Sequence, residues 1–316
     1  MRMSKVSIIV PTIARATLIK TLESISKQTY RDFELVVTDD TDGKALDIVE
    51  VFRKNHPQIK VKYVINQKYV KGPGGNKNNG LDYAEGEFVT IVDDDDELFP
   101  EAIETGMKHI EEKDLEVFLA NCIDNVKGEK TGLSYGVSEY LTYYDFLRGR
   151  YDGEYFGIVK KSLIGDDRFP EDAWGAEGVL WYKVLKKAKR IYYFDKPLRI
   201  YTIDNYDRFT LQSEKFPQRA VLGYFYLLDY FFQDYRDYAP KQLLRLIFHG
   251  IYFSRLAGNL RQSVFFLKKA VEANWIIFSV AFVSFVFCWM LPRKLLLFTK
   301  ERLIKKFSPK IRQILR

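Results

Sequence analysis

The stretch FVTIVDDDD, from Phe88 to Asp96, joins five aromatic or β-branched residues directly to four aspartates. The first half predicts a buried strand of a parallel sheet, because such strands are apolar on both faces. The aspartates then lie at the carboxyl end of that strand, where open α/β sheets bind their ligands. Adjacent like charges favour a bound cation. A solvated acidic loop is the alternative, but the strand before it and the turn at residues 98–100 place the acids at a sheet edge.

Strand-like and helix-like segments alternate through the first part of the chain. Short apolar runs predict strands at residues 6–10, 33–38, 61–65 and 88–92. Helical spacing of apolar residues predicts helices at residues 15–27, 44–55 and 77–85. The glycine-rich segment Lys71–Asn76 predicts a flexible loop before the last of these helices. This alternation predicts an α/β fold with a doubly wound, mostly parallel sheet flanked by helices.

The remaining chain continues this pattern and then becomes helical. Further strands are predicted at residues 116–120, 151–159 and 191–201, and a hairpin or loop at 124–140. Helices are predicted at residues 100–112, 176–187, 218–234, 240–256, 260–272 and 275–291. We therefore expect an α/β domain over residues 1–214, a helical extension over 215–274, and a separate apolar and basic segment over 275–316.

The net charge of +7 is concentrated near the C-terminus. Residues 293–316 carry nine Lys or Arg and one Glu, a net of +8, so residues 1–292 sum to −1. Two cysteines in apolar surroundings exclude a disulfide framework and predict free thiols in a reducing compartment. Three histidines without paired spacing argue against a zinc site. The apolar run near Met1 is too short for a signal peptide, and none is expected.

Charged side chains follow several predicted strands at one edge of the sheet. Asp39 and Asp40 end the second strand, Arg15 follows the first, and Lys77 begins the helix after the third. Carboxylates at this density, with those of Asp93–Asp96, suit Mg²⁺ or Mn²⁺ rather than zinc. The cations suit a diphosphate. The alternatives are a strand-ending turn residue for Asp39 and ordinary solvated cations for Arg15 and Lys77.

The order and spacing of these motifs resemble those of the family 2 glycosyltransferases, which have the GT-A fold. The resemblance covers roughly residues 4–210, and it depends on the segments Val6–Arg15, Phe33–Asp40, Asn76–Gly80 with Gly86-Glu87, and Asp93–Asp95. The last of these matches the DxD motif of the family. The resemblance implies an inverting transfer of a sugar from a nucleotide-diphosphate donor, usually a UDP-sugar, to a hydroxyl of a glycan or lipid-linked acceptor.

The resemblance also implies roles for individual residues. A donor pocket is implied for Pro11, Thr12, Arg15, Asp39, Lys77, Asp93 and Asp94. Asp39 would accept a hydrogen bond from the base, and Asp95 with Asp93 would hold the divalent cation, Mg²⁺ or Mn²⁺. Lys77 stands where the family often has Arg, so the charge is kept and the bidentate fork is lost. Shaping the turn is the alternative for Asp94 and Asp96.

The catalytic base is the point where the chain departs from the family pattern. The family has an acidic pair at the start of a helix, and here the second member is Gly178. Glu177 is the first candidate for the base and Asp172 the second, since the reaction needs a carboxylate near the acceptor hydroxyl. For Glu177 the alternative is an acid favoured by the helix dipole. Trp174 would stack on the acceptor sugar or pack inside the protein.

The C-terminal segment predicts attachment to a membrane. Residues 275–291 lack charge, Trp275 and Trp289 stand near the two ends, and basic, amphipathic residues 293–316 follow. We expect this tail to bind an anionic surface on the cytoplasmic face, either with a surface helix or with a short span. A helix of a C-terminal bundle or a subunit contact is the alternative. No nucleic-acid partner is expected, since the tail interleaves aliphatic residues with its cations.

Two other classes of protein share parts of this pattern. A catalytically weak or inactive nucleotide-sugar-binding relative is the main alternative, because of Gly178. A sugar-phosphate nucleotidyltransferase is disfavoured, because it needs a glycine-rich phosphate loop directly after the first strand, where Pro11–Arg15 stands. The sequence leaves open the donor sugar, the acceptor, the linkage and the oligomeric state.

Overall fold

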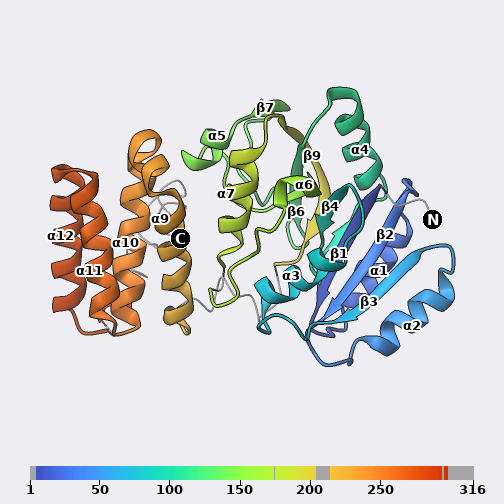
Figure 1. Cartoon of the computed structure of the whole chain (residues 1–316), viewed down its shortest axis with the longest axis horizontal. Coiled ribbons are helices and arrows are strands. Elements are labelled where there is room, and N and C mark those ends of the chain that lie inside the picture. The colour runs from blue at the N-terminus through green and yellow to red at the C-terminus, as the bar shows by residue number, and fades with distance from the viewer. Residues whose placement is uncertain (1–4, 174, 204–213, 294, 298–316) are drawn as a thin grey trace. The chain divides into compact units, whose positions relative to one another are not determined.

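The computed structural model describes residues 5–173, 175–203, 214–293 and 295–297. The chain forms two compact units, residues 1–208 and residues 209–316 (Figure 1). The predicted acceptor-side residue Trp174 lies outside the described residues.

The first unit is built on a nine-stranded sheet. Its strands are β1 (Val6–Thr12), β2 (Phe33–Asp39), β3 (Lys60–Ile65), β4 (Phe88–Ile91), β5 (Glu97–Leu98), β6 (Val117–Asp124), β7 (Glu139–Leu141), β8 (Tyr155–Lys160) and β9 (Ile191–Tyr201). Their order is β3-β2-β1-β4-β8-β6-β9-β5, and β7 pairs with β9. The strands β3, β2, β1 and β4 are all parallel, as predicted. Beyond β4 the sheet is mixed, because β8 runs antiparallel to both β4 and β6.

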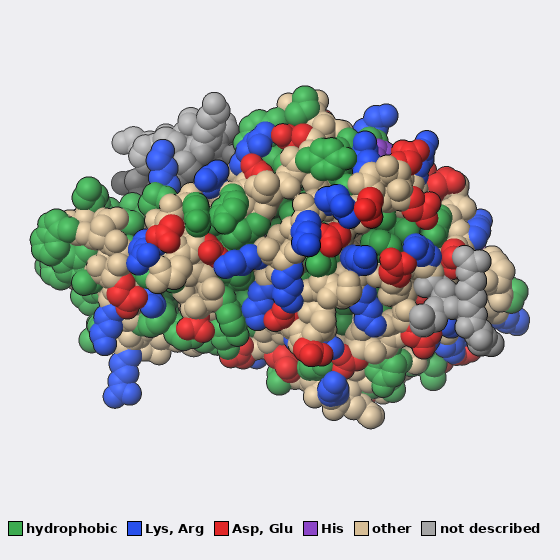
Figure 2. Space-filling view, turned by 45° about the horizontal axis from the view of Figure 1, so that its top comes forward, with side chains coloured by type: hydrophobic (Ala, Val, Ile, Leu, Met, Phe, Trp, Pro, Cys, Tyr) green, Lys and Arg blue, Asp and Glu red, His purple; other side chains and the backbone are tan. Residues whose placement is uncertain are grey.

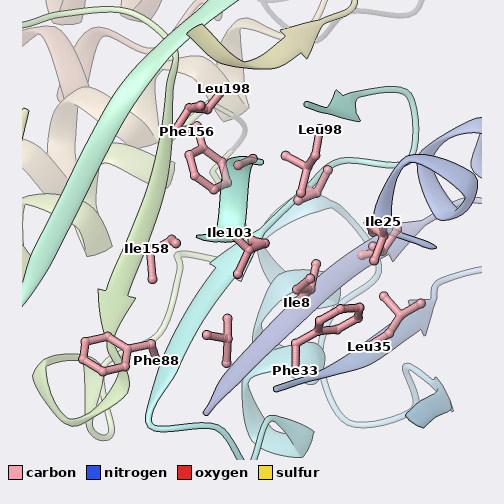
Figure 3. Close-up of a cluster of buried hydrophobic side chains, with 14 of the residues drawn as sticks. Ile8, Ile25, Phe33, Leu35, Phe88, Leu98, Ile103, Phe156, Ile158 and Leu198 are labelled. Atoms are coloured by element: carbon pink, nitrogen blue, oxygen red, sulfur yellow. The ribbon is translucent and has the colours of Figure 1, made fainter. Parts of the chain in front are cut away.

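Helices cover both faces of this sheet, which confirms the predicted α/β class (Figure 1). They are α1 (Leu18–Ser26), α2 (Leu46–Asn55), α3 (Pro73–Tyr83), α4 (Ala102–Lys113), α5 (Tyr143–Leu147), α6 (Lys161–Ile164) and α7 (Glu177–Lys187). A hydrophobic core cluster joins α1, α2 and α4 to alternate residues of β1 and β2, including Ile8, Ile25, Leu35 and Ile103 (Figure 3). Burying one stripe of each helix against the sheet in this way is the main favourable contribution to folding.

Helix α3 lies on the opposite face and corrects one prediction. The segment Lys71–Asn76 is not a flexible loop, because the helix begins at Pro73. Glycine is needed here for close approach: a Cβ at Gly75 would stand 1.9 Å from the carbonyl oxygen of Val70, and one at Gly80 would stand 2.4 Å from Ile9. The Pro-Gly-Gly composition hides the helix from a sequence-based prediction, since tertiary contact rather than helix propensity fixes it.

Side-chain amides secure α3 to the strands. The Asn76 side chain donates to the carbonyl of Thr12 at 3.1 Å and accepts from the Thr38 hydroxyl at 2.7 Å. Asn78 donates to the Phe169 carbonyl at 2.9 Å, and accepts from the Phe169 amide at 2.8 Å. These bonds place the start of α3 beside the carboxyl ends of β1 and β2, and they therefore position Lys77 near the predicted site.

The second unit consists of helices in its described part. They are α9 (Pro217–Tyr238), α10 (Pro240–Leu256), α11 (Leu260–Ala273) and α12 (Trp275–Met290), close to the predicted ranges. Helix α10 packs against α9, α11 and α12. Both cysteines of the chain are free and buried, Cys122 in β6 and Cys288 in α12. Within the described residues, no helix combines the length and the apolar character that crossing a bilayer requires.

Candidate functional site

The four aspartates after β4 alternate between exposed and buried positions. The side chains of Asp93 and Asp95 are 38% and 16% exposed. Those of Asp94 and Asp96 are almost fully buried. A tight turn produces this alternation, since the amide of Asp96 donates to the carbonyl of Asp93 at 3.0 Å. The first and third aspartates are thus the ones that can meet a ligand.

Asp94 holds the end of β1. It accepts hydrogen bonds from the Thr12 hydroxyl at 2.7 Å, the Ile13 amide at 3.1 Å and the Arg15 guanidinium at 2.6 Å. Burial opposes the charge of Arg15, but Asp94 and Asp95 outweigh it and raise the pKa of the guanidinium. Three predicted donor-site residues, Thr12, Arg15 and Asp94, are therefore brought together, with Asp94 turned inward to organise the other two.

Asp96 links the acidic turn to the end of β9. It accepts from the Thr202 amide at 2.9 Å, while the Thr202 hydroxyl donates to the carbonyl of Asp95. The second oxygen of Asp96 lies 3.5 Å from Arg199 Nε and makes no hydrogen bond within the described residues. Burial raises the pKa of Asp96 to about 7, against the opposing charge of Arg199. This part of the site orders the backbone rather than facing a ligand.

Arg199 is a site residue that the sequence analysis missed. Its guanidinium is buried, donates to the Cys122 thiol at 3.2 Å and lies 3.5 Å from Glu154. Glu154 is half exposed and interacts electrostatically with Lys77 and other charged groups of the site. Neither residue belongs to a motif, and more than forty positions separate them. Only the pairing of β6 with β8 and β9 brings them together, so no local signal could have found them.

Lys77 connects the two halves of the predicted site. Its ammonium lies 3.3 Å from Asp93 Oδ1 and 3.7 Å from Glu177 Oε1. Its side chain is only 13% exposed, so these charges interact with little screening by solvent. Partial burial would raise the pKa of Asp93, but Lys77 and Arg199 outweigh it and lower this pKa. Asp93, which is predicted to bind the donor, and Glu177, which is predicted to be the base, therefore both interact with Lys77.

The two candidates for the base come from the segment that enters α7. Glu177 is the first residue of that helix, and its side chain is 31% exposed. Asp172 lies exposed in the preceding loop. The structure thus brings Glu177, through Lys77, to the acidic turn.

Asp39 differs from the other predicted donor residues because its side chain is fully buried. Its oxygens accept from the amides of Thr41, Gly43 and Ala45 and from the hydroxyls of Thr41 and Tyr63, at 2.5 to 3.2 Å. Burial would raise the pKa of Asp39, but these bonds lower it. Five donors fill the acceptor capacity of a carboxylate. A bound base could reach Asp39 only if one donor, such as the Tyr63 hydroxyl, moved aside.

Asp93 and Asp95 are the candidate ligands for a divalent cation. No group of three or more His, Cys, Asp or Glu side chains there is arranged as a metal cage. Asp93 and Asp95 nevertheless offer two partly exposed carboxylates at one edge, each within 3.5 Å of a cationic side chain. Mg²⁺ is commonly held by one or two carboxylates together with phosphate oxygens and water. The residues therefore fit a cation that binds together with a diphosphate ligand.

Comparisons with known proteins identify the family of the chain. The family model described as Glycosyl transferase family 2 matches residues 7–158. A GalNAc(5)-diNAcBac-PP-undecaprenol beta-1,3-glucosyltransferase of Campylobacter jejuni is 37% identical over 82% of this chain and 85% of its own. The Escherichia coli enzyme WfgD, a UDP-Glc:alpha-D-GlcNAc-diphosphoundecaprenol beta-1,3-glucosyltransferase, is 26% identical over 57% of this chain and 70% of its own.

A solved structure shows the same architecture. The crystal structure of Staphylococcus aureus TarS, residues 1–349 in complex with UDP-GlcNAc, matches with a TM-score of 0.65 at 21% identity. It covers 90% of this chain and 89% of that one. At this level of identity the likeness concerns the fold.

Proposed function

Since the chain is a glycosyltransferase of family 2 with the GT-A fold, we propose that it transfers glucose from UDP-glucose to a hydroxyl of a diphosphate-linked lipid oligosaccharide, with inversion. The observation that supports this most is the cluster of Asp93, Asp95, Lys77 and Glu177 at the carboxyl edge of the sheet. We assign catalysis to residues 1–214. The sugar and the lipid-linked acceptor are those named for the two relatives described above.

The donor would bind along the edge formed by β1 and β4. Arg15 and Lys77 supply positive charge for the diphosphate, and Pro11 and Thr12 supply the wall at the end of β1. In this proposal Asp39 accepts a hydrogen bond from uracil after the Tyr63 hydroxyl has moved aside. This movement is needed because Asp39 is fully buried and already accepts hydrogen bonds from five internal donors.

Asp95, assisted by Asp93, would hold Mg²⁺ or Mn²⁺ together with the donor diphosphate. When bound, the cation supplies positive charge that stabilises the leaving UDP. The cationic side chains of Arg15 and Lys77 lie beside the same carboxylates and contribute charge of the same sign. The protein thus stabilises the negative charge that develops on the diphosphate with groups that are already in place.

Glu177 would act as the base. It removes the proton of the acceptor hydroxyl as that oxygen forms a bond to the anomeric carbon, and the bond from this carbon to the diphosphate oxygen breaks on the opposite side. The bonding electrons leave with UDP, and the proton remains on Glu177. Lys77, 3.7 Å away, would hold the Glu177 carboxylate in position. Asp172 and Glu154 are the other carboxylates that could take this role, and Trp174 would stack on the acceptor sugar.

The acceptor would reach the enzyme at the cytoplasmic face of a membrane. Residues 293–316, with a net charge of +8 in the sequence, would attract anionic lipid. An acceptor joined to a lipid through diphosphate remains in the membrane, so an enzyme attached to the same surface meets it at high effective concentration.

The experiment that tests this function is a transfer assay with the purified full-length chain. UDP-glucose and a synthetic lipid-diphosphate oligosaccharide are incubated with Mg²⁺ or Mn²⁺, and product is measured by mass. We expect a product heavier by one hexose, and loss of activity on chelation of the cation. Binding of UDP-sugars without transfer or hydrolysis of any donor in a panel would instead favour the non-catalytic relative that Gly178 leaves open.

A further inference from the structure

Helix α12 has two different faces. Ile277, Ala281, Ser284 and Cys288 are buried against the rest of the second unit. Most of the remaining surface is a continuous apolar stripe, which we call the α12 apolar face. It consists of Trp275, Ile276, Val280, Phe282, Val283, Val286, Phe287 and Met290, each between 37% and 77% exposed. Figure 2 shows hydrophobic side chains gathered at the far left of the view, where α12 lies in Figure 1.

An apolar surface of this kind is unfavourable in water. The helix has no charged residue among its 16 positions, whereas a helix on a protein surface normally has a polar face. Soluble proteins rarely expose contiguous apolar patches larger than a few hundred Å². The α12 apolar face therefore indicates a surface that is covered when the protein functions.

We propose that the α12 apolar face lies in the interface of an anionic lipid bilayer, with the helix axis parallel to the membrane plane. The 16 residues of α12 reach only about 24 Å at 1.5 Å per residue, which is shorter than a bilayer core of roughly 30 Å. One side of the helix is already packed on α10 and α11, so the outward stripe alone is available to lipid. This proposal goes beyond the transfer reaction, since it would hold whichever sugar is moved.

The charges that follow the helix identify the occupant. The sequence from Arg293 to Arg316 has a net charge of +8, with nine Lys or Arg. Such residues are attracted to acidic headgroups at the level where an in-plane helix lies. A second copy of the chain is a poorer occupant, because pairing two such faces would bring two tails of +8 together. Apolar side chains beside a run of cations fit a membrane that carries negative charge.

The two tryptophans of α12 have separate roles. Trp275 is 76% exposed at the start of the helix, where it can enter the interface. Trp289 instead donates to the Ser263 hydroxyl at 3.0 Å and has the Arg255 guanidinium over its ring. The polar atom of Trp289 is thus used inside the second unit.

Sedimentation of the full-length chain with vesicles tests the proposal. We expect binding to vesicles of phosphatidylcholine and phosphatidylglycerol, and weaker binding to phosphatidylcholine alone. Val283→Glu and Ile276→Glu should each weaken binding about tenfold or more, since each removes a large apolar side chain from lipid. The matched control is Val51→Glu, at a 55% exposed position of α2. Unchanged vesicle binding by both α12 variants, with unaltered thermal unfolding, would overturn the proposal.

A second measurement separates the possible occupants. Lipids brominated near the headgroup should quench the wild-type tryptophan fluorescence more than lipids brominated deep in the chain, and Trp275→Phe should abolish most of this difference. Stronger quenching by the deep bromines would indicate insertion across the core and contradict an in-plane helix. Self-association in solution that Val283→Glu abolishes while vesicle binding persists would assign the face to a second copy, and it would also overturn the proposal.

Discussion

Two acidic segments follow strands β2 and β4 of the same sheet, and their side chains have different roles. Asp39, at the end of β2, is fully buried and accepts hydrogen bonds from five donors of its own chain. Asp93, just beyond β4, is 38% exposed and lies within 3.3 Å of Lys77. The comparison teaches that an acid at the end of a strand can hold the following loop or face a ligand, and that the path of the next few residues decides between these roles.

The physical reason lies in the turns. After β2 the chain bends back through Asp42 and Gly43, both with positive φ, so that successive amides converge on Asp39. Gly43, at φ of 105°, adopts a conformation that favours glycine. After β4 the chain makes a single tight turn and enters β5 at Glu97. That turn directs Asp94 and Asp96 inward and leaves Asp93 and Asp95 partly exposed.

The largest effect is expected at Glu177, which like Asp93 interacts with Lys77. Glu177→Gln should lower the kcat for sugar transfer roughly 100- to 10,000-fold, as loss of a general base does. Its stability should change by less than about 0.5 kcal/mol, because the side chain is partly exposed. The steady-state transfer assay and urea unfolding measure the two effects. Asp172→Asn is the matched control, and a larger loss in that variant would reassign the base.

Substitution of the buried Asp39 is expected to lower the stability of the protein rather than the rate of transfer. Asp39→Ala leaves several buried donors without a partner and should lower the free energy of unfolding by about 3 kcal/mol. Its folded pKa is lowered, so its contribution is present above the unfolded pKa and is lost as the pH falls through the folded value. Urea unfolding from pH 3 to 7 measures this. If the free energy of unfolding of Asp39→Ala fell with decreasing pH as much as that of the wild type, this account would be contradicted.

Replacing the shared cation sharpens the comparison further. Lys77→Met should reduce kcat/KM roughly 10- to 100-fold, since a charged hydrogen bond contributes about 1.5–3 kcal/mol. Because Lys77 lowers the pKa of Asp93, its removal should raise that pKa and move the acidic limb of the pH profile of kcat/KM upward. Lys77→Arg keeps the charge and should keep the position of that limb. If the acidic limb of the pH profile lay at the same pH for the wild type and for Lys77→Met, Lys77 would not control the pKa of Asp93.

The smallest effect is expected at Tyr63, whose hydroxyl donates a hydrogen bond to Asp39. Tyr63→Phe removes the hydrogen bond of 2.5 Å to Asp39 and should cost about 1 kcal/mol of stability. It should also strengthen UDP binding by a few fold, because an acceptor position of Asp39 becomes available to uracil. Calorimetric titration with UDP measures the second effect. Unaltered affinity in a folded variant would remove Asp39 from the nucleotide pocket and leave it a purely structural role.

Much of the fold could be predicted because it depends on local periodicity. The ranges of β9 and α10 agree with the prediction residue for residue, since long apolar patterns determine them. The start of α3 was missed because its glycines serve contacts with β1 and with Val70, which no local pattern reveals. The mixed pairing around β8 also depends on contacts distant in sequence.

The candidate site was predictable in part for the same reason. Sequence motifs identified Asp93, Lys77 and Glu177, which the structure brings together. They could not separate the saturated Asp39 from the exposed Asp93, because both follow a strand. Arg199 and Glu154 belong to no motif, and they reach the site only through the pairing of distant strands.

The central claim is that the acidic edge after β4, rather than the one after β2, is where the donor reacts. The most direct test compares transfer per folded molecule for Asp95→Ala and Asp39→Asn, with the folded fraction taken from urea unfolding. We expect Asp95→Ala to lose roughly 100-fold or more of its kcat, as removal of one stabilising group does, with unchanged stability. Asp39→Asn should lose stability and retain most of its kcat when folded. Full activity in Asp95→Ala, at saturating donor and Mg²⁺ or Mn²⁺, would contradict the account.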